Sequence, residues 1–423
     1  MNSSNVRSFT GVTDKDIIRE LANLGQITFE ITDACNLKCK YCGYGEFYND
    51  YDNRDNINLS FEKAISIIDY LATLWQSNLN KSANRNVYIS FYGGEPLLNV
   101  PFIEKVIEYI KQKNILNRTF TYSMTTNAML LDRHIDFIAK NDFSLLISLD
   151  GNREQNGYRV DKNGKNSFDR IIKNIHLLKN NYPHYFNDRV NFNAVLHNKN
   201  TYEGVYNFIQ TEFGKIPRIT ELNNMGIREE KRGEFNSTYR NSNESLMQSE
   251  HYDEIEKKMF LNSSNYQSVT TFLLKYSNSM FTNYNQLLYG KPKLNSEFVT
   301  GTCIPFSKKM FITVKGKILP CERIGHQFAM GRITDENIVL LDFEQIASMH
   351  NNYLQKVLKQ CRTCKIQLVC TQCIYNLENI DQKPKCLGHA NAREFNKYVA
   401  SKLEFIEKHP EDYYRILKEV IID

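Results

Sequence analysis

The sequence has no cysteine over its long middle section, because none of its ten cysteines lies between residues 43 and 302. Three cysteines fall at 35–42 and the other seven between 303 and 386. A disulfide framework does not normally leave so long a gap, and cysteines in a cytoplasmic chain more often bind metal. The distribution therefore predicts two separate metal-binding regions.

Other absences narrow the class of protein. The N-terminus has no apolar stretch of the kind found in signal peptides, and no later run is long enough to span a bilayer. The net charge of +5 comes from 53 basic and 48 acidic residues, with no basic block typical of nucleic-acid binding. We expect a soluble cytoplasmic protein that binds neither nucleic acid nor a membrane.

Six short apolar stretches alternate with amphipathic helical patterns in the first half of the chain. The expected strands are 26–32, 87–92, 120–125, 144–149, 189–196 and 219–223. The expected helices between them are 61–75, 102–112, 132–140, 168–180 and 201–211. This alternation predicts an α/β fold of parallel β/α units, in which functional residues lie at the C-terminal ends of the strands.

Cys35, Cys39 and Cys42 form a C-x3-C-x2-C motif directly after the first expected strand. Three thiolates on one short loop can hold three irons of a four-iron cluster and leave the fourth iron open to another ligand. A zinc site is the alternative, but zinc needs a fourth ligand close by. No histidine lies between Cys35 and residue 100, which favours the cluster.

This motif, with Tyr41 before its last cysteine, resembles that of the radical S-adenosylmethionine (SAM) enzymes. In that family the open iron chelates the amino and carboxylate groups of SAM. One electron then cleaves SAM to methionine and a 5′-deoxyadenosyl radical, which abstracts a hydrogen atom from the substrate. The resemblance also implies a partial (β/α)6 barrel of the TIM type.

Two further motifs fall on the same expected rim. Gly93, Gly94, Glu95 and Pro96 follow the second strand and resemble the family's turn that binds the amino group of SAM. Glycines let backbone approach a ligand closely, and either exposed carbonyls or Glu95 can accept from an ammonium group. Taken alone, this sequence is usually only a turn.

Ser148 and Asp150 end the fourth expected strand, and Arg159 follows. This stretch resembles the region where related maturases hold the SAM carboxylate with a serine and an arginine, whose fork of donors suits a carboxylate. The alternatives are a turn begun by Asp150 and a surface charge at Arg159. Tyr41 is expected to pack on adenine, with a core tyrosine as the alternative.

The C-terminal cysteines resemble those of the SPASM domain, which carries two auxiliary four-iron clusters. The implied ligands of the outer cluster are Cys361, Cys364, Cys370 and Cys386, and those of the inner cluster are Cys303, Cys321 and Cys373. The spacing departs from the family between Cys370 and Cys373, where two residues replace the usual three. The fourth inner ligand is either Glu297 or absent, and two zinc sites assisted by His326 and His389 are the alternative.

The domain organisation follows from these assignments. We expect an N-terminal extension at 1–24, a radical SAM partial barrel at 25–225 and a bridging segment at 226–300. A small cysteine-rich SPASM domain at 301–390 and C-terminal helices at 391–423 complete the chain.

The resemblance implies a peptide-modifying oxidoreductase with three four-iron clusters and SAM as cofactors. The expected substrate is a ribosomally made precursor peptide that receives a thioether or carbon–carbon crosslink. The alternative is an anaerobic sulfatase maturase that forms formylglycine, and a non-catalytic metal-stabilised binding module is the third hypothesis. Expected partners are an electron donor such as flavodoxin or ferredoxin, and a site for the leader on 226–300, on a sheet edge or on a separate protein.

Glu322 is the expected catalytic proton acceptor, because it directly follows the implied cluster ligand Cys321. Related sulfatase maturases have an aspartate at this position. A carboxylate in a partly dry site is expected to have a raised pKa, which suits a general base. The alternative is that Glu322 only pairs with Arg323 or another cation.

Overall fold

The computed structural model describes residues 11–81, 86–116, 118–259, 264–277, 288 and 300–419. The chain divides into two compact units. The sheet unit consists of Thr13–Lys258 and Ile304–Ile346. The cysteine-rich unit consists of Met1–Val12, Met259–Cys303 and Ala347–Asp423.

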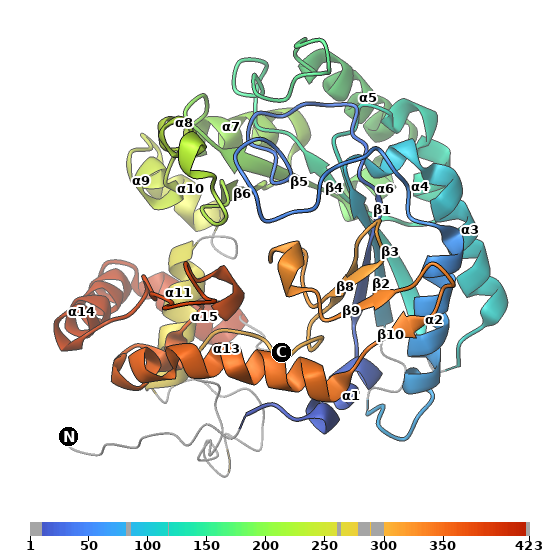
Figure 1. The fold of residues 1–423 in the computed structure, drawn as a ribbon. Helices are drawn as coiled ribbons and strands as arrows, with labels where there is room; N and C mark the ends of the chain where they lie inside the picture. The colour runs from blue at the N-terminus through green and yellow to red at the C-terminus, as the bar shows by residue number, and fades with distance from the viewer. Residues whose placement is uncertain are drawn as a thin grey trace. The chain divides into compact units, whose positions relative to one another are not determined.

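The sheet unit is built on six parallel strands that pair in chain order, as the sequence predicts. They are β1 (Gln26–Thr32), β2 (Asn86–Gly93), β3 (Thr119–Thr126), β4 (Ser144–Ser148), β5 (Val190–Leu196) and β6 (Arg218–Glu221). The helices of these units are α1 (Asp14–Ala22), α2 (Phe61–Trp75), α3 (Val100–Lys113), α4 (Ile135–Lys140), α5 (Phe168–Asn181), α6 (Pro183–Arg189) and α7 (Tyr202–Phe213). In Figure 1 the helices α2 to α5 lie outside the strands.

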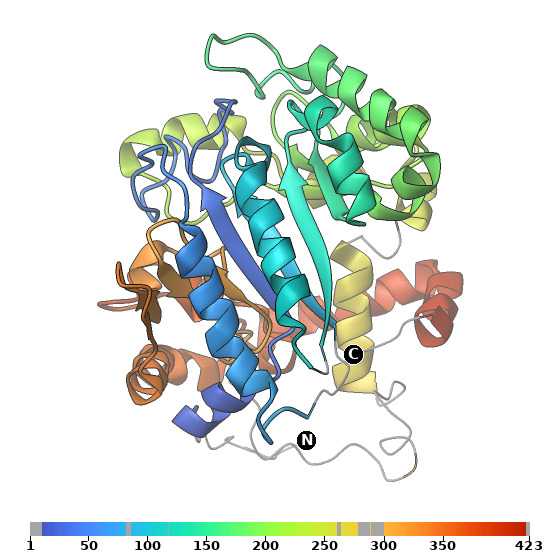
Figure 2. The same cartoon turned by 90° about the vertical axis from the view of Figure 1, so that its right-hand side faces the viewer.

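Local sequence explains where these elements begin. Ser60 accepts a hydrogen bond from the backbone N–H of Lys63 at 3.2 Å and so caps α2, as expected for a serine at this position. One face of α2 is buried and consists of Ala64, Ile67, Ile68, Leu71, Ala72 and Trp75. Figure 2 shows α2 and its neighbour α3 lying against the strands. Because β1 to β6 run parallel, their C-terminal ends all lie on one rim of the sheet.

The sheet continues beyond β1 with four short strands that the sequence did not predict. These are β7 (Met310–Ile312), β8 (Lys317–Leu319), β9 (Gly331–Ile333) and β10 (Val339–Leu340). β7 pairs parallel with β1 and the others pair antiparallel, which gives the order β10-β9-β8-β7-β1-β2-β3-β4-β5-β6. Strands of two or three residues are too short to show an alternating pattern.

The segment after β6 is helical within the sheet unit. Its helices are η3 (Glu229–Lys231), α8 (Arg232–Thr238), α9 (Ser242–Met247) and α10 (Tyr252–Lys258). Phe235 of α8 packs with Phe47 and Tyr48 of the cysteine loop, at ring-centroid distances of 5.8 and 6.5 Å. These contacts hold the start of the bridging segment against the loop that carries the first cysteine motif.

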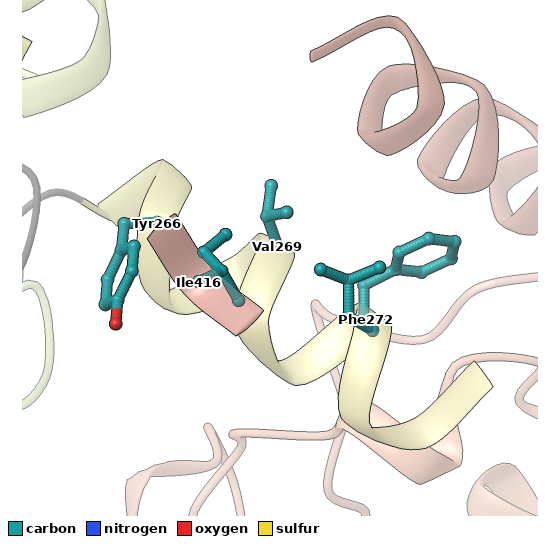
Figure 3. Packing of buried hydrophobic residues seen from close by; sticks show 5 residues of the cluster. Tyr266, Val269, Phe272 and Ile416 are labelled. Carbon is teal, nitrogen blue, oxygen red and sulfur yellow. The ribbon is translucent and has the colours of Figure 1, made fainter. Parts of the chain in front are cut away.

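The cysteine-rich unit is mainly helical. It contains α11 (Ser264–Phe272) with the π-helical turn η5 (Leu273–Ser277), most of α13 (Phe343–Thr363), α14 (Ala392–Lys408) and α15 (Pro410–Glu419). Tyr266, Val269 and Phe272 of α11 pack in one cluster with Ile416 of α15, as Figure 3 shows. Pro410 begins α15, a first helical position that suits proline. None of the described helices is both long and apolar enough to cross a lipid bilayer.

Candidate functional site

The first cysteine motif lies in the loop after β1, where the sequence places it. Cys35, Cys39 and Cys42 are free and partly buried. The loop is held by short-range hydrogen bonds, including one from the backbone N–H of Leu37 to the Cys35 sulfur at 3.4 Å. Burial raises the pKa of Cys35 to about 11 and that of Cys39 to about 12. A metal that binds these sulfurs must therefore displace protons.

The glycine-rich turn after β2 packs directly on the start of this loop. The N–H of Gly94 donates to the carbonyl of Thr32 at 2.8 Å, and the N–H of Glu95 donates to that of Ala34 at 2.9 Å. A Cβ on Gly93 would lie 2.1 Å from the Thr32 oxygen, and one on Gly94 would lie 2.0 Å from the Ala34 oxygen. Glycine is needed at both positions because the two backbones touch.

Glu95 is fully buried and its carboxylate is engaged within the protein. It accepts from the Thr126 hydroxyl at 2.6 Å, the Asn127 N–H at 2.8 Å and the Leu97 N–H at 3.1 Å. Burial raises its pKa to about 7, although these hydrogen bonds lower it in part. Of the two acceptors expected for the SAM amino group, the Glu95 carboxylate is thus already bonded to groups of the protein. Pro96, which is buried, begins the short helix η1 (Pro96–Leu98).

Asp150 follows β4 and is the centre of a buried polar network. The guanidinium of Arg159 donates to both of its oxygens at 3.0 Å, and the Val195 N–H donates at 3.0 Å. The Tyr41 hydroxyl also donates to Asp150, and His197 lies 3.5 Å away. Burial alone would raise the pKa of Asp150, but Arg159 and His197 outweigh it and bring the pKa to about 2. Neither a simple turn nor a surface charge describes these residues.

The other residues expected to contact SAM lie in or beside this network. Tyr41 is 7% exposed, and its ring stacks on His197 with centroids 5.3 Å apart. Ser148, the last residue of β4, lies opposite Asn193 of β5. Two of the Arg159 nitrogens are committed to Asp150, so the guanidinium has fewer donors free for a ligand than the sequence suggested. The sequence did not predict that His197 lies beside Asp150. The only signal for it was the position of His197 directly after β5.

Cys321 and Glu322 follow β8, also within the sheet unit. The carboxylate of Glu322 forms a salt bridge with Lys309 at 3.1 Å, and its side chain is 18% exposed. Burial by itself would raise the pKa of Glu322. The charge and hydrogen bond of Lys309 lower this pKa by more, so that it lies below its usual value. The expectation of a raised pKa is therefore not met, because a lysine on the neighbouring β7 segment supplies the counter-charge.

An aromatic group that the sequence did not indicate follows Cys42 in the loop after β1. Tyr44 and Tyr51 pack edge to face at 4.9 Å, and the Arg54 guanidinium lies 3.8 Å from the Tyr44 ring centre. Burial raises the pKa of Tyr51 to about 12, with smaller contributions from nearby groups that include Asp50, Cys321 and Cys42. Tyr51 is thus close to both a residue of the first motif and an expected auxiliary ligand.

The cysteine-rich unit gathers the four expected outer ligands. Burial raises the pKa of Cys361 to about 12, and Cys370, Cys386 and Cys364 act on it from close by in the same direction. Burial also raises the pKa of Cys373, and here the contributing cysteine is Cys303. The four cysteines of the group around Cys361 are those named as outer ligands, whereas Cys321 of the expected inner set belongs to the sheet unit. The ligand sets therefore stay a prediction. Glu297 lies outside the described residues.

The histidines offered as zinc ligands have other contacts. His389 is close to the Thr363 hydroxyl, at 3.0 Å, and His326 lies 3.2 Å from Asp52. Neither contact involves a cysteine, so the described residues give the zinc alternative no direct support.

The comparisons with known proteins agree with this geometry. Residues 29–211 match the model of the Radical SAM superfamily. A cysteine-type anaerobic sulfatase-maturating enzyme of Clostridium novyi is 31% identical over 45% of this chain and 49% of its own length. The radical SAM cyclopropyl synthase TigE of Paramaledivibacter caminithermalis is 29% identical over 46% of this chain and 40% of its own. The matched stretches thus span half or less of these relatives, both of which are enzymes.

The fold has a full-length counterpart among solved structures. The structure of native anSMEcpe with bound AdoMet and Kp18Cys peptide is 18% identical, with a TM-score of 0.59, over 92% of this chain and 98% of that one. At this identity the likeness concerns the fold, which is the parallel sheet with an added cysteine-rich region. The domain match supports SAM and an iron–sulfur cluster as cofactors of the cysteine loop and its neighbours. Residues 29–211 of this chain therefore correspond to a radical SAM domain.

Proposed function

We propose that this chain is a radical SAM peptide maturase that installs a crosslink, such as a thioether or carbon–carbon bond, in a ribosomally made precursor peptide. The observation that carries the proposal is the meeting of three motifs at one end of the parallel strands. The cysteine loop follows β1, the glycine turn follows β2, and Asp150 with Arg159 follows β4. A four-iron cluster on Cys35, Cys39 and Cys42 would supply the electron that cleaves SAM.

The chain's own residues would hold SAM beside this cluster. The backbone carbonyls of Gly93 and Gly94 would accept from its amino group, and Ser148 with the free donors of Arg159 would bind its carboxylate. Tyr41 would border the adenine while Asp150 keeps both Tyr41 and Arg159 in place. The two auxiliary cysteine groups would hold two further four-iron clusters, which makes three in all.

Crosslinking removes two hydrogens from the peptide. One leaves as a hydrogen atom that ends in 5′-deoxyadenosine, and the other leaves as a proton and an electron. Glu322 would accept the proton, since it is the carboxylate next to the expected ligand Cys321 and lies in the sheet unit with the SAM site. The auxiliary clusters would accept the electron, and an external donor such as flavodoxin or ferredoxin would supply the one needed for SAM cleavage.

Formation of formylglycine in a sulfatase is the second candidate. It is favoured by the likeness to the sulfatase-maturating enzyme of Clostridium novyi and by the solved fold counterpart that contains a peptide. The two candidates separate when the reconstituted protein is given SAM, a reductant and either a short precursor peptide or a sulfatase-derived peptide. The precursor peptide should raise SAM cleavage and acquire a mass change of minus two hydrogens per crosslink. A change confined to the sulfatase peptide would establish the second candidate.

Replacing Glu322 with glutamine should separate hydrogen abstraction from product formation. The change keeps size and hydrogen bonding but removes the proton acceptor. SAM cleavage and transfer of hydrogen from the peptide should persist, while product formation falls by about 10²-fold or more, as for loss of a general base. Product and 5′-deoxyadenosine are quantified in the same reaction by mass spectrometry.

The exposed Glu336 provides a matched control, because Glu336→Gln makes the same chemical change at a residue with no part in the site. Its product yield should equal that of the unaltered enzyme. A Glu322→Gln enzyme that forms product at the normal rate would remove Glu322 from the mechanism.

A further inference from the structure

Asn127 links the turn after β3 to the first cysteine of the motif. It is 7% exposed. Its side-chain nitrogen lies 2.7 Å from the Asn36 oxygen and 3.8 Å from the Cys35 sulfur. The Cys35 sulfur thus faces two N–H donors, since the backbone of Leu37 donates to it at 3.4 Å.

The orientation of the Asn127 amide is fixed by its other contacts. Its side-chain oxygen accepts from the backbone N–H of Met129 at 3.0 Å, so the atom that faces the cysteine loop is the nitrogen. That nitrogen carries two hydrogens. One is used by Asn36, and the second is directed to the sulfur.

The position of Asn127 is held from the other side by the buried Glu95. The Asn127 backbone donates to the Glu95 carboxylate at 2.8 Å, and the adjacent Thr126 hydroxyl donates at 2.6 Å. Glu95 in turn hydrogen-bonds to the Ala34 carbonyl through its own N–H. The turn after β3, the turn after β2 and the cysteine loop therefore form one connected network. In the described part of the chain, Cys39 and Cys42 have no comparable side-chain donor.

We propose that Asn127 is a positioning residue that donates to the Cys35 sulfur and thereby raises the reduction potential of the cluster held by the cysteine loop. The inference rests on the proposed function, because it requires that cluster. Hydrogen bonds to the sulfurs of an iron–sulfur cluster are among the protein's means of setting its potential. A donor stabilises the reduced cluster more, since reduction adds negative charge to the sulfurs. A network that served only to hold the loops would leave the potential unchanged.

The test is a redox titration of the anaerobically reconstituted full-length chain, followed by electron paramagnetic resonance (EPR). The signal of this cluster is the one that is missing when Cys35, Cys39 and Cys42 are all replaced by alanine. Its midpoint potential should fall in Asn127→Ala, which removes the donor, and fall further in Asn127→Asp, which places a negative oxygen by the sulfur. The signals of the auxiliary clusters should not shift.

Asn174→Ala is the matched control. Asn174 is also buried and donates to the carbonyls of Ala128 and Met129, so its loss loosens the same turn without touching the sulfur. In this variant, the midpoint potential of the cluster on the cysteine loop should equal that in the unaltered protein. An unchanged potential in Asn127→Ala at full iron content, or an equal fall in Asn174→Ala, would overturn the inference while leaving the proposed function intact.

A measurement on the unaltered chain covers the case in which the variants lose iron. Asparagine side chains labelled with ¹⁵N should give a nitrogen coupling in the pulsed EPR of the reduced cluster. Asn36 presents its oxygen to Cys35, so its nitrogen is not the expected source. Absence of the coupling would overturn the inference. Absence of the cluster itself, with no SAM cleavage, would instead contradict the proposed function.

Discussion

Replacing Cys35, Cys39 and Cys42 together with alanine should abolish SAM cleavage and remove one third of the bound iron. The unaltered chain should bind about 12 iron and 12 sulfide ions, by four per cluster, and the variant about 8 of each. SAM cleavage is lost because no other described residues offer three cysteines on one loop beside the glycine turn. Iron and sulfide analysis is combined with quantification of 5′-deoxyadenosine under anaerobic conditions.

The paired replacement of Cys361 and Cys364 by alanine is the matched control. It removes two thiols from the group around Cys361 in the cysteine-rich unit and should lower iron content while SAM cleavage continues. Persistent 5′-deoxyadenosine formation by the triple variant would contradict the assignment of the first motif. A content of two zinc ions with a single cluster would contradict the two auxiliary clusters.

Replacing Asp150 with asparagine should destabilise the sheet unit and impair SAM binding. The change leaves the buried Arg159 guanidinium without its counter-charge, and breaking a buried pair in this way costs about 3–5 kcal/mol. It also weakens the contact that holds Tyr41. Denaturant unfolding measures the loss of free energy, and equilibrium binding of SAM to the reconstituted protein measures the functional effect.

Asp142→Asn is the appropriate comparison, because Asp142 also binds an arginine through two nitrogens but at the surface. The side chains of that pair, Arg189 and Asp142, are 41% and 60% exposed. Loss of an exposed pair costs about 0–1 kcal/mol. Equal losses in the two variants would show that burial of the Asp150 pair has no energetic importance.

The parallel part of the fold could be predicted closely from the sequence. β1 and α2 have the predicted bounds, because their apolar residues follow the periods of a buried strand and an amphipathic helix. The strands β7 to β10 could not be predicted, because strands this short gain their stability from pairing with β1 and one another rather than from a local pattern. The 21-residue helix α13 was also missed, although it brings Cys361 towards the other outer cysteines.

The order of the expected strands was enough to predict that the cysteine loop, the glycine turn and Asp150 lie on one rim of the sheet. Side-chain partnerships were less predictable, because they depend on segments distant in sequence. Lys309, on a segment that pairs with β1, was not foreseen as the partner of Glu322. Likewise, the pairing of Arg159 with Asp150 reflects burial that local sequence does not reveal.

The most direct test of the account is transfer of deuterium from a peptide to 5′-deoxyadenosine. A precursor peptide deuterated at all its carbon positions is incubated anaerobically with the reconstituted protein, SAM and a reductant. We predict that 5′-deoxyadenosine acquires deuterium and that the peptide loses one deuterium and one further hydrogen or deuterium per crosslink. A crosslinked peptide accompanied only by unlabelled 5′-deoxyadenosine would contradict the claim that this chain abstracts hydrogen from a peptide.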